Sequence, residues 1–265
     1  MTETGCPLPA PRPLPAPRKD WALFLDIDGT LLELAATPSE VVVPPDLPGL
    51  LRALTRVLGG AVALVTGRSL ADVDTLFSPL ALTAAGQHGA EIRLPNGATE
   101  RLGPADGVVA GLMAEITAFA AARPGILVEN KGMTIAVHCR KVPQYQAELG
   151  QFLTDLAAKH SDRLETIRGH RVFEIKPRNL SKRTAVERLI RIAPFAGRLP
   201  LFIGDDRTDE DGFAAVRALG GHAIRVGPDE ADLGRATVAT WRIADPACTR
   251  AFLSHVAMSL DADTR

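Results

Sequence analysis

Short runs of apolar residues, each ending at a polar residue, recur along the chain and alternate with helical patterns. Residues 21–25 read WALFL and stop at Asp26, and residues 61–65 read AVALV and stop at Thr66. A continuous apolar run of this length is typical of a strand that is buried on both faces of a parallel sheet. Comparable runs lie at 199–203, 223–226 and 238–243. The alternation predicts an α/β fold with a doubly wound, Rossmann-type parallel sheet as its core.

Amphipathic helices are predicted between these strands. In residues 47–58 the leucines and Val57 fall on one helical face. Ser69 with Asp72 three residues later matches a capping box that opens the next helix. Further helices, with their expected N-caps, are predicted over 181–192 after Ser181 and over 208–219 from Thr208.

The stretch from 91 to 176 has a different pattern. Apolar and polar residues alternate over 133–140, and two amphipathic segments lie around 109–120 and 149–156. One-sided alternation predicts a small antiparallel sheet with helices on one face. We therefore expect a smaller α+β cap domain, residues 91–176, inserted into a core made of residues 20–90 and 177–265.

Prolines at every second position from Pro7 to Pro17 set residues 1–19 apart from the rest. Proline lacks a backbone donor and fixes φ, so this segment is expected to be a polyproline-like or disordered tail outside the fold.

Composition narrows the class of protein. In 265 residues, 46% are apolar and 23% charged, a balance that permits a sizeable core. A net charge of −1 gives no excess of positive charge for binding nucleic acid or anionic membranes. The apolar runs are much shorter than the roughly 18 residues of a membrane span. Three scattered cysteines form no CxxC pair, which argues against a disulfide framework or zinc ribbon. We expect a cytoplasmic enzyme with a small-molecule substrate; its oligomeric state is open, and a monomer is compatible with the sequence.

Two acidic residues, Asp26 and Asp28, directly follow the first predicted strand in the sequence DIDGT. Ligands of open α/β sheets bind beside the carboxyl ends of the strands, and Gly29 permits a sharp turn there. Two carboxylates this close repel each other unless a cation lies between them, which favours Mg²⁺. An Asx-type turn that merely ends the strand is the alternative interpretation.

A second acidic run, GDDRTDED at 204–211, directly follows the run 199–203. Burying carboxylates at a strand end costs free energy unless a metal ion or a basic side chain pairs with them. An acid-rich helix N-terminus is the alternative, but it does not explain Asp205 and Asp206 at the strand edge.

Two smaller signals complete the set. Thr66-Gly67-Arg68 follows the second strand and opens a helix, so its hydroxyl and amides can bind an anion. Lys182 begins another helix. Each feature alone is compatible with an ordinary loop or cap, but together they give the order acid pair, hydroxyl, lysine, acid cluster.

With these motifs the chain resembles the haloacid dehalogenase superfamily of phosphotransferases. It is similar within it to the trehalose-6-phosphate phosphatase family, through LDIDGTLLEL, PSEVVVP, LVTGRS, GQHGAEIR, VENKGM, FEIKPRNLSKRTAV and GDDRTDEDGF. The resemblance runs from about residue 20 to 258. It implies a Mg²⁺-dependent phosphatase with a HAD-like core, a cap domain and a sugar phosphate as substrate.

The resemblance also implies roles for the motif residues. Asp26 is the expected nucleophile, which takes the phosphoryl group as an aspartyl-phosphate, and Asp28 the general acid and base. Lys182 balances the negative charge on Asp26 and the phosphate. Phosphate oxygens are expected to contact Thr66, Gly67, Arg68 and Lys182.

Mg²⁺ is expected at Asp26, the backbone carbonyl of Asp28 and Asp205, with Asp206 or Asp209 reaching it through water. In the cap, the resemblance implies that Glu129, Lys131 and Glu174 bind sugar hydroxyls, with His88 and Arg140 as further candidates.

Two other functions stay open at this point. One is a phosphatase of the same superfamily for sucrose phosphate or a mannosyl phosphoester. The other is a catalytically silent module that binds sugar phosphates, although such a module needs neither the acid pair nor the lysine.

Overall fold

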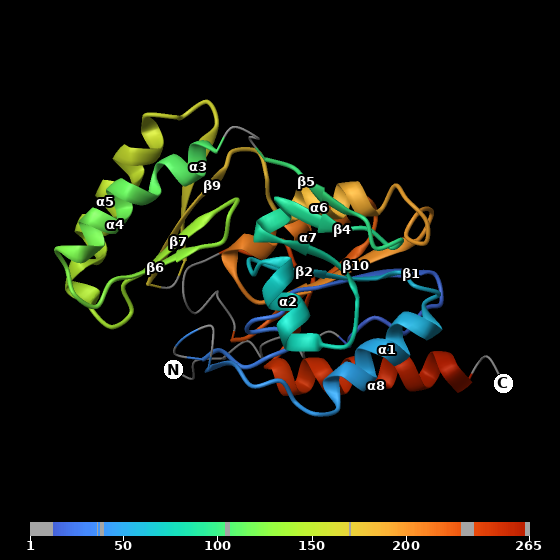
Figure 1. Cartoon of the computed structure of the whole chain (residues 1–265). Helices are drawn as coiled ribbons and strands as arrows, with labels where there is room; N and C mark the ends of the chain where they lie inside the picture. The colour runs from blue at the N-terminus through green and yellow to red at the C-terminus, as the bar shows by residue number, and fades with distance from the viewer. Residues whose placement is uncertain are drawn as a thin grey trace, which may run out of the picture.

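The computed structural model describes residues 13–35, 37, 40–103, 107–169, 171–228 and 236–262, which contain one large and one small sheet (Figure 1). The large sheet has the strand order β12-β11-β10-β1-β2-β3-β4-β5. Its parallel strands are β1 (Trp21–Leu25), β2 (Val62–Val65), β3 (Thr83–Gly86), β10 (Leu199–Gly204), β11 (His222–Val226) and β12 (Trp241–Ile243). The expected doubly wound parallel sheet is thus confirmed.

Helices cover both faces of this sheet, which is why its central strands β1, β2 and β10 are apolar throughout. In β1, Leu23 and Leu25 pack on one face and Ala22 and Phe24 on the other. The first face carries α1 (Leu47–Val57), α2 (Leu70–Phe77) and α8 (Pro246–Ala262), and the second carries α6 (Lys182–Leu189) and α7 (Glu210–Ala218). Figure 1 shows the two layers on either side of the sheet.

Two short antiparallel strands extend the large sheet beyond β3. They are β4 (Glu91–Arg93) and β5 (Thr99–Arg101), and β4 pairs directly with β3. The expected boundary at residue 91 places residues 91–101 in the inserted domain. That boundary is wrong, because these residues hydrogen-bond to the large sheet.

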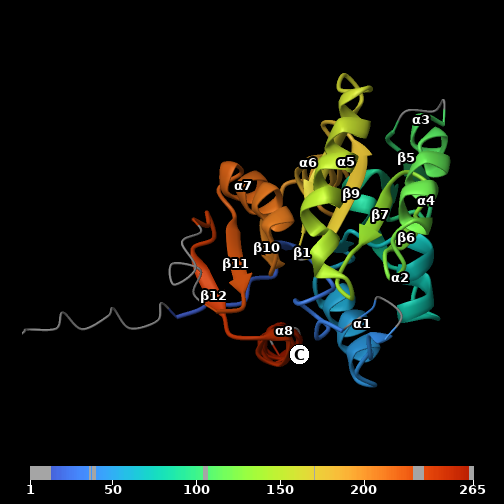
Figure 2. The same cartoon turned by 90° about the vertical axis from the view of Figure 1, so that its left-hand side faces the viewer.

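The inserted unit contains the small sheet and three helices. Its antiparallel strands, in the order β6-β7-β9-β8, are β6 (Leu127–Asn130), β7 (Ile135–His138), β9 (Val172–Pro177) and β8 (Leu164–Arg168). One face of this sheet packs on α3 (Val108–Gly111), α4 (Met113–Ala121) and α5 (Gln146–Ala158). Figure 2 turns this unit toward the viewer, with its helices in front of the large sheet.

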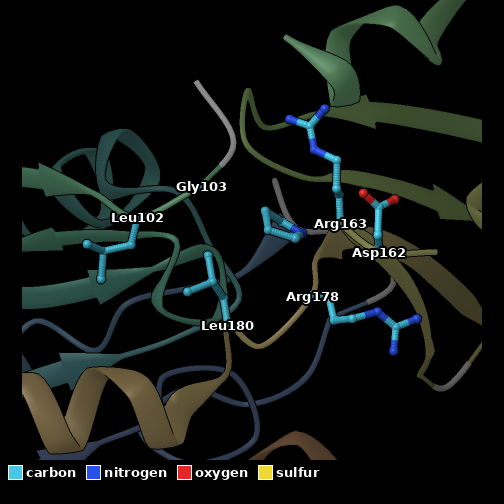
Figure 3. Close-up of a pocket in the computed structure, with 7 residues that line it drawn as sticks. Leu102, Gly103, Asp162, Arg163, Arg178 and Leu180 are labelled. Carbon is cyan, nitrogen blue, oxygen red and sulfur yellow. The ribbon is translucent and has the colours of Figure 1, made fainter. Parts of the chain in front are cut away.

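The chain passes between the two units twice, near Gly103 and after Pro177. An open pocket of about 280 Å³ lies at these passages (Figure 3), lined by Leu102, Gly103, Asp162, Arg163, Pro177, Arg178 and Leu180. None of these residues belongs to the predicted site. A Cβ at position 103 would lie 2.1 Å from Cε of Met133, so the end of that side chain would have to shift to admit it.

The proline-rich segment joins the fold from residue 13 onward. The indole Nε1 of Trp241 donates a hydrogen bond to the Pro13 carbonyl at 3.0 Å, and Leu14 packs on the core. The expectation of a tail outside the fold is therefore wrong for residues 13–19, while its first twelve residues, Cys6 included, lie outside the described part.

Three local expectations also differ. Asp206, rather than Thr208, caps the turn Arg207–Asp209 that leads into α7, because its side chain accepts the Arg207 amide proton. The helix expected over 181–192 ends at Leu189, and β12 begins only at Trp241.

Among the described residues, no helix combines the length and apolar character that a membrane span needs.

Replacing Trp241 with phenylalanine tests the anchoring of the N-terminal segment. Trp241→Phe keeps an aromatic ring against His222 but removes the N–H donor to Pro13. We expect the free energy of unfolding to fall by about 0.5–1 kcal/mol in urea titrations. Deleting residues 1–17 should lower it further, and an unchanged value in both proteins would contradict the anchoring role.

Candidate active site

Four parallel strands bring their polar residues to one edge of the large sheet. Asp26 follows β1, Thr66 follows β2, the turn Gln87–Gly89 follows β3 and Asp205 follows β10. In a parallel sheet the carboxyl ends of the strands lie side by side, so residues far apart in the sequence become neighbours.

Lys182, the first residue of α6, lies at the centre of this edge. Its Nζ donates hydrogen bonds to Oδ1 of Asp26 and to Oδ1 of Asp209, each at 2.6 Å. The three side chains are almost completely buried. Burial by itself would lower the pKa of Lys182, but Asp209 and Asp26 raise it well above its usual value, so the ammonium stays charged.

Asp209 also holds the acidic loop in place. Its Oδ2 accepts the backbone N–H groups of Asp205 at 3.0 Å and of Asp206 at 2.9 Å. Gly204 leaves room for this carboxyl group, since a Cβ there would lie 2.3 Å from Cγ of Asp209. The Asp206 side chain is exposed instead.

Thr30 links the two acidic motifs and was not singled out from the sequence. Its hydroxyl lies 3.2 Å from Oδ2 of Asp26 and 3.5 Å from Oδ1 of Asp205. Gly29 makes this approach possible, with φ +78° and no space for a Cβ, which would lie 2.1 Å from Oδ2 of Asp205. The signal for Thr30 was its place in DIDGT.

The acidic cluster has more negative charge than its lysine neutralises. One oxygen each of Asp26, Asp205 and Asp209 lies within 4.8 Å of the other two. Burial, followed by the charges of the neighbouring carboxylates, raises the pKa of Asp205, and burial raises that of Asp26. Neighbouring carboxylates repel each other when they are ionised, and a divalent cation between them removes this repulsion. Such a cation binds oxygen ligands of this kind.

Arg68 pairs with Asp28 at the rim of this cluster. Its Nε and Nη2 donate to the two carboxylate oxygens of Asp28, both at 2.7 Å. This two-point contact fixes the Asp28 carboxylate, while the buried Thr66 hydroxyl accepts the Arg68 amide proton at 3.2 Å. The expected phosphate-binding loop thus lies next to the acid pair.

The small unit contacts the same edge through charged side chains. Nζ of Lys131 donates to the Gly67 carbonyl at 3.0 Å, and Oε2 of Glu174 lies 3.3 Å from Nε2 of His88 and 3.7 Å from Nζ of Lys131. Burial alone would raise the pKa of Glu174, but His88 and Lys131 lower it to about 2. The structure therefore brings Lys131, Glu174 and His88 together.

The other two candidates in the small unit, Glu129 and Arg140, have different hydrogen-bond partners, although Glu129 still interacts electrostatically with Lys131 and Arg68. Glu129 Oε2 is 3.0 Å from Nε2 of His138, and Nη1 of Arg140 donates to the Ala35 carbonyl at 2.6 Å. Arg140 therefore ties the small unit to the loop after β1.

A tight turn after β3 supports both the phosphate loop and the small unit. Gln87 and His88 have positive φ values of 48° and 56°. The His88 amide donates to the Thr66 carbonyl at 3.0 Å, and Oε1 of Gln87 accepts the Met133 amide at 3.0 Å. The sequence analysis missed Gln87, although it stands inside GQHGAEIR.

Comparison with known proteins agrees with the resemblance. The model of the trehalose-phosphatase family matches residues 24–247. The chain belongs to the trehalose-phosphatase family. A probable trehalose-phosphate phosphatase of Sinorhizobium fredii (strain NBRC 101917 / NGR234) is 47% identical over 210 residues, 79% of this chain and 78% of the relative. The trehalose-6-phosphate phosphatase of Escherichia coli (strain K12) is 39% identical over 224 residues, 84% and 82% of the two chains.

Solved structures agree on the fold of this family member. The C-terminal domain of the Candida albicans trehalose-6-phosphate phosphatase superposes with a TM-score of 0.78 at 21% identity, covering 91% of this chain and 92% of that one. A haloacid dehalogenase-like hydrolase from Bacillus subtilis superposes with a TM-score of 0.62 at 16% identity, covering 88% and 99%. The HAD-like fold expected from the sequence is confirmed.

Replacing Asp209 with asparagine tests its part in holding Lys182 and the acidic loop. An amide has one oxygen, so its NH₂ group must face either the ammonium or the two backbone N–H groups. Asp209→Asn should lower the free energy of unfolding by about 3 kcal/mol, because the buried Lys182 ammonium keeps only one of its two carboxylate partners and an NH₂ group is left facing other donors. Asp211→Asn, exposed at the start of α7, is the control, with a change within about 0.5 kcal/mol. Equal unfolding midpoints for both variants would contradict this role.

Proposed function

We propose that this protein is a Mg²⁺-dependent phosphatase that hydrolyses trehalose 6-phosphate to trehalose and inorganic phosphate through an aspartyl-phosphate. One observation carries the proposal: a chain of the trehalose-phosphatase family presents the buried Asp26–Lys182 pair at the carboxyl edge of its parallel sheet. The names of its relatives supply the substrate.

Asp26 is the proposed nucleophile. One of its carboxylate oxygens attacks phosphorus, the bond from phosphorus to the sugar oxygen breaks, and the phosphoryl group stays on Asp26. Lys182, at 2.6 Å, remains charged and offsets the negative charge that gathers on the carboxylate and the phosphate.

Asp28 is the proposed general acid and base. It gives a proton to the departing sugar oxygen and then takes one from the water that cleaves the aspartyl-phosphate. In the free protein the Arg68 guanidinium donates to both oxygens of Asp28. In the proposed reaction it also binds the incoming phosphate. The Thr66 hydroxyl and the amides of Gly67 and Arg68 bind the phosphate oxygens.

Asp26, Asp205 and the backbone carbonyl of Asp28 would hold Mg²⁺, with Asp209 as the outer partner. The donor set fits, because one carboxylate oxygen each of Asp26, Asp205 and Asp209 lies within 4.8 Å of the other two, and the single Lys182 ammonium offsets only part of their charge. When bound, the ion reduces the repulsion between the anionic carboxylate and the anionic phosphate. Asp206 is the weaker candidate, since its side chain caps the Arg207 amide.

The small unit would select the sugar. Glu129, Lys131 and Glu174, with His88 and Arg140, offer polar donors and acceptors for hydroxyl groups, and such sites discriminate strongly against analogues that lack a matching hydroxyl.

We place the reaction in the cytoplasm, where the thiols of Cys139 and Cys248, both free here, remain reduced.

Phosphate release by the purified protein tests the proposal directly. We expect Mg²⁺-dependent release from trehalose 6-phosphate, abolished by EDTA, in clear preference to sucrose 6-phosphate, glucose 6-phosphate and an aryl phosphate. Asp26→Asn should lower kcat by at least about a thousandfold, because it removes the nucleophile, while Asp211→Asn retains activity. Equal rates on all the sugar phosphates would contradict trehalose 6-phosphate as the specific substrate. Turnover by Asp26→Asn would contradict Asp26 as the nucleophile.

The acidic cluster predicts how Mg²⁺ binding depends on pH. Because the pKa values of Asp26 and Asp205 are raised to about 7 and about 9 in the folded protein, these two groups hold more protons there than in the unfolded chain, and their contribution to the stability of the metal-free protein falls as pH rises through this range. Mg²⁺ must displace these protons, so it binds more tightly at higher pH.

The shift in the thermal unfolding midpoint on adding Mg²⁺ measures this effect. It should be larger at pH 8 than at pH 6 and should disappear in Asp205→Asn. A shift that is independent of pH, or that survives in Asp205→Asn, would place the ion elsewhere.

A further inference from the structure

Two buried oxygen atoms of the small unit have no partner. Thr134 is completely buried and Glu174 is 7% exposed. Among the residues that the structure describes, neither Oγ1 of Thr134 nor Oε1 of Glu174 has a hydrogen-bond partner. Both belong to the part of the chain that contacts the catalytic edge.

Strand register places the two side chains on one face of the small sheet. Ile135 packs among the helices of the small unit and pairs with Ile175, whereas Ala136 pairs with Glu174. Because side chains alternate along a strand, Thr134 shares with Glu174 the opposite face, which is turned to the large sheet.

The contacts of Glu174 leave one of its oxygens free. His88 and Lys131 both lie against Oε2, so this half of the carboxylate is held by an imidazole and an ammonium group. The Thr134 hydroxyl is close enough to help lower the pKa of Glu174, yet it forms no hydrogen bond of ordinary length and angle. The Glu174 Oε1 and the Thr134 hydroxyl are thus buried in the same unit, the hydroxyl acts on the carboxylate, and neither atom forms a hydrogen bond of ordinary length and angle among the described residues.

Such a pair is costly to the free protein. A buried polar atom without a hydrogen bond destabilises the fold, and native proteins keep such atoms mostly where a ligand or a reaction uses them. A group that both donates and accepts would satisfy the two atoms at once, since an ionised carboxylate only accepts and a threonine hydroxyl can donate.

We propose that Thr134 is a specificity residue whose hydroxyl, together with Oε1 of Glu174, binds one hydroxyl group of the substrate's sugar. The sugar hydroxyl donates to Glu174 and accepts from Thr134. A phosphate oxygen would be repelled by the carboxylate, and an ammonium group would duplicate Lys131. This inference rests on the proposed function, because it requires a sugar phosphate in the site.

The enclosure of the two atoms sets a condition for binding. With Lys131 hydrogen-bonded to the Gly67 carbonyl, the small unit is in contact with the phosphate loop. A sugar hydroxyl reaches Thr134 once this contact opens, and the same opening releases the Lys131 ammonium for the sugar.

Thr134→Val separates this role from a structural one, because the two effects have opposite signs. Valine has the shape of threonine without the hydroxyl, so the thermal unfolding midpoint should rise or stay constant. In the same variant we expect KM for trehalose 6-phosphate to rise about three- to tenfold, with kinetics on p-nitrophenyl phosphate unchanged. Thr134→Ser should restore the KM, and Thr134→Ala repeats the test if the valine variant folds poorly.

Thr240→Val is the matched control, because the Thr240 hydroxyl is also enclosed and unpaired among the described residues but lies beside β12. It should leave both KM values unchanged. An unchanged KM for trehalose 6-phosphate in Thr134→Val would mean that the sugar does not bind these two atoms. Equal losses of activity on trehalose 6-phosphate and p-nitrophenyl phosphate would mean a general defect of the enzyme. Either result overturns the proposal.

The wild-type protein separates this inference from the proposed function. If it prefers another sugar phosphate, the assigned substrate fails and the Thr134 comparison is made with that sugar. If it hydrolyses no sugar phosphate, both proposals fail.

Discussion

The buried ammonium group of Lys182 fixes the geometry on which the rest of the site depends. A lysine that is 2% exposed requires charged partners, and it has two: Asp26 at the end of β1 and Asp209 beyond β10. Three segments that are distant in the sequence are therefore held at one point. None of them can move away without leaving a charge unpaired in the interior, and the second oxygen of Asp209 extends this constraint to the acidic loop.

A second constraint acts where β3 ends. Consecutive left-handed conformations at Gln87 and His88 cost free energy, and they persist because the surroundings hold them. The His88 ring lies so close to Gly67 that a Cβ there would be 2.8 Å from Nε2. The same turn contacts Met133 and Glu174 of the small unit. One strained turn thus couples the phosphate loop to the unit that would select the sugar.

Except for β3, whose short sequence TAAG gave no apolar run, the parallel strands and the acidic cluster were predictable because their signals are local. β1 and β2 are apolar on both faces, and Asp26, Thr66 and Asp205 stand directly after strands. The strands β4 and β5 were misplaced because short polar segments such as EIR and TER carry no information about their pairing partner.

The cap before α7 was expected at Thr208, but Asp209 is turned inward and Asp206 is the cap, which depends on the tertiary arrangement of the acidic loop. Pairs such as Arg68 with Asp28, 40 residues apart, and His88 with Glu174, 86 residues apart, follow from the tertiary arrangement alone. Thr134 gave no signal, because alternation marks it only as facing away from the apolar core.

The contacts between the two units also bear on how a sugar would gain binding energy. Lys131 and Oε2 of Glu174 already have partners in the free protein, so sugar hydroxyls at these atoms exchange one hydrogen bond for another, with little net gain. Atoms that are unpaired beforehand lose nothing when they bind. The free energy of recognition should therefore concentrate where the free protein is least well satisfied, at Thr134 and Oε1 of Glu174.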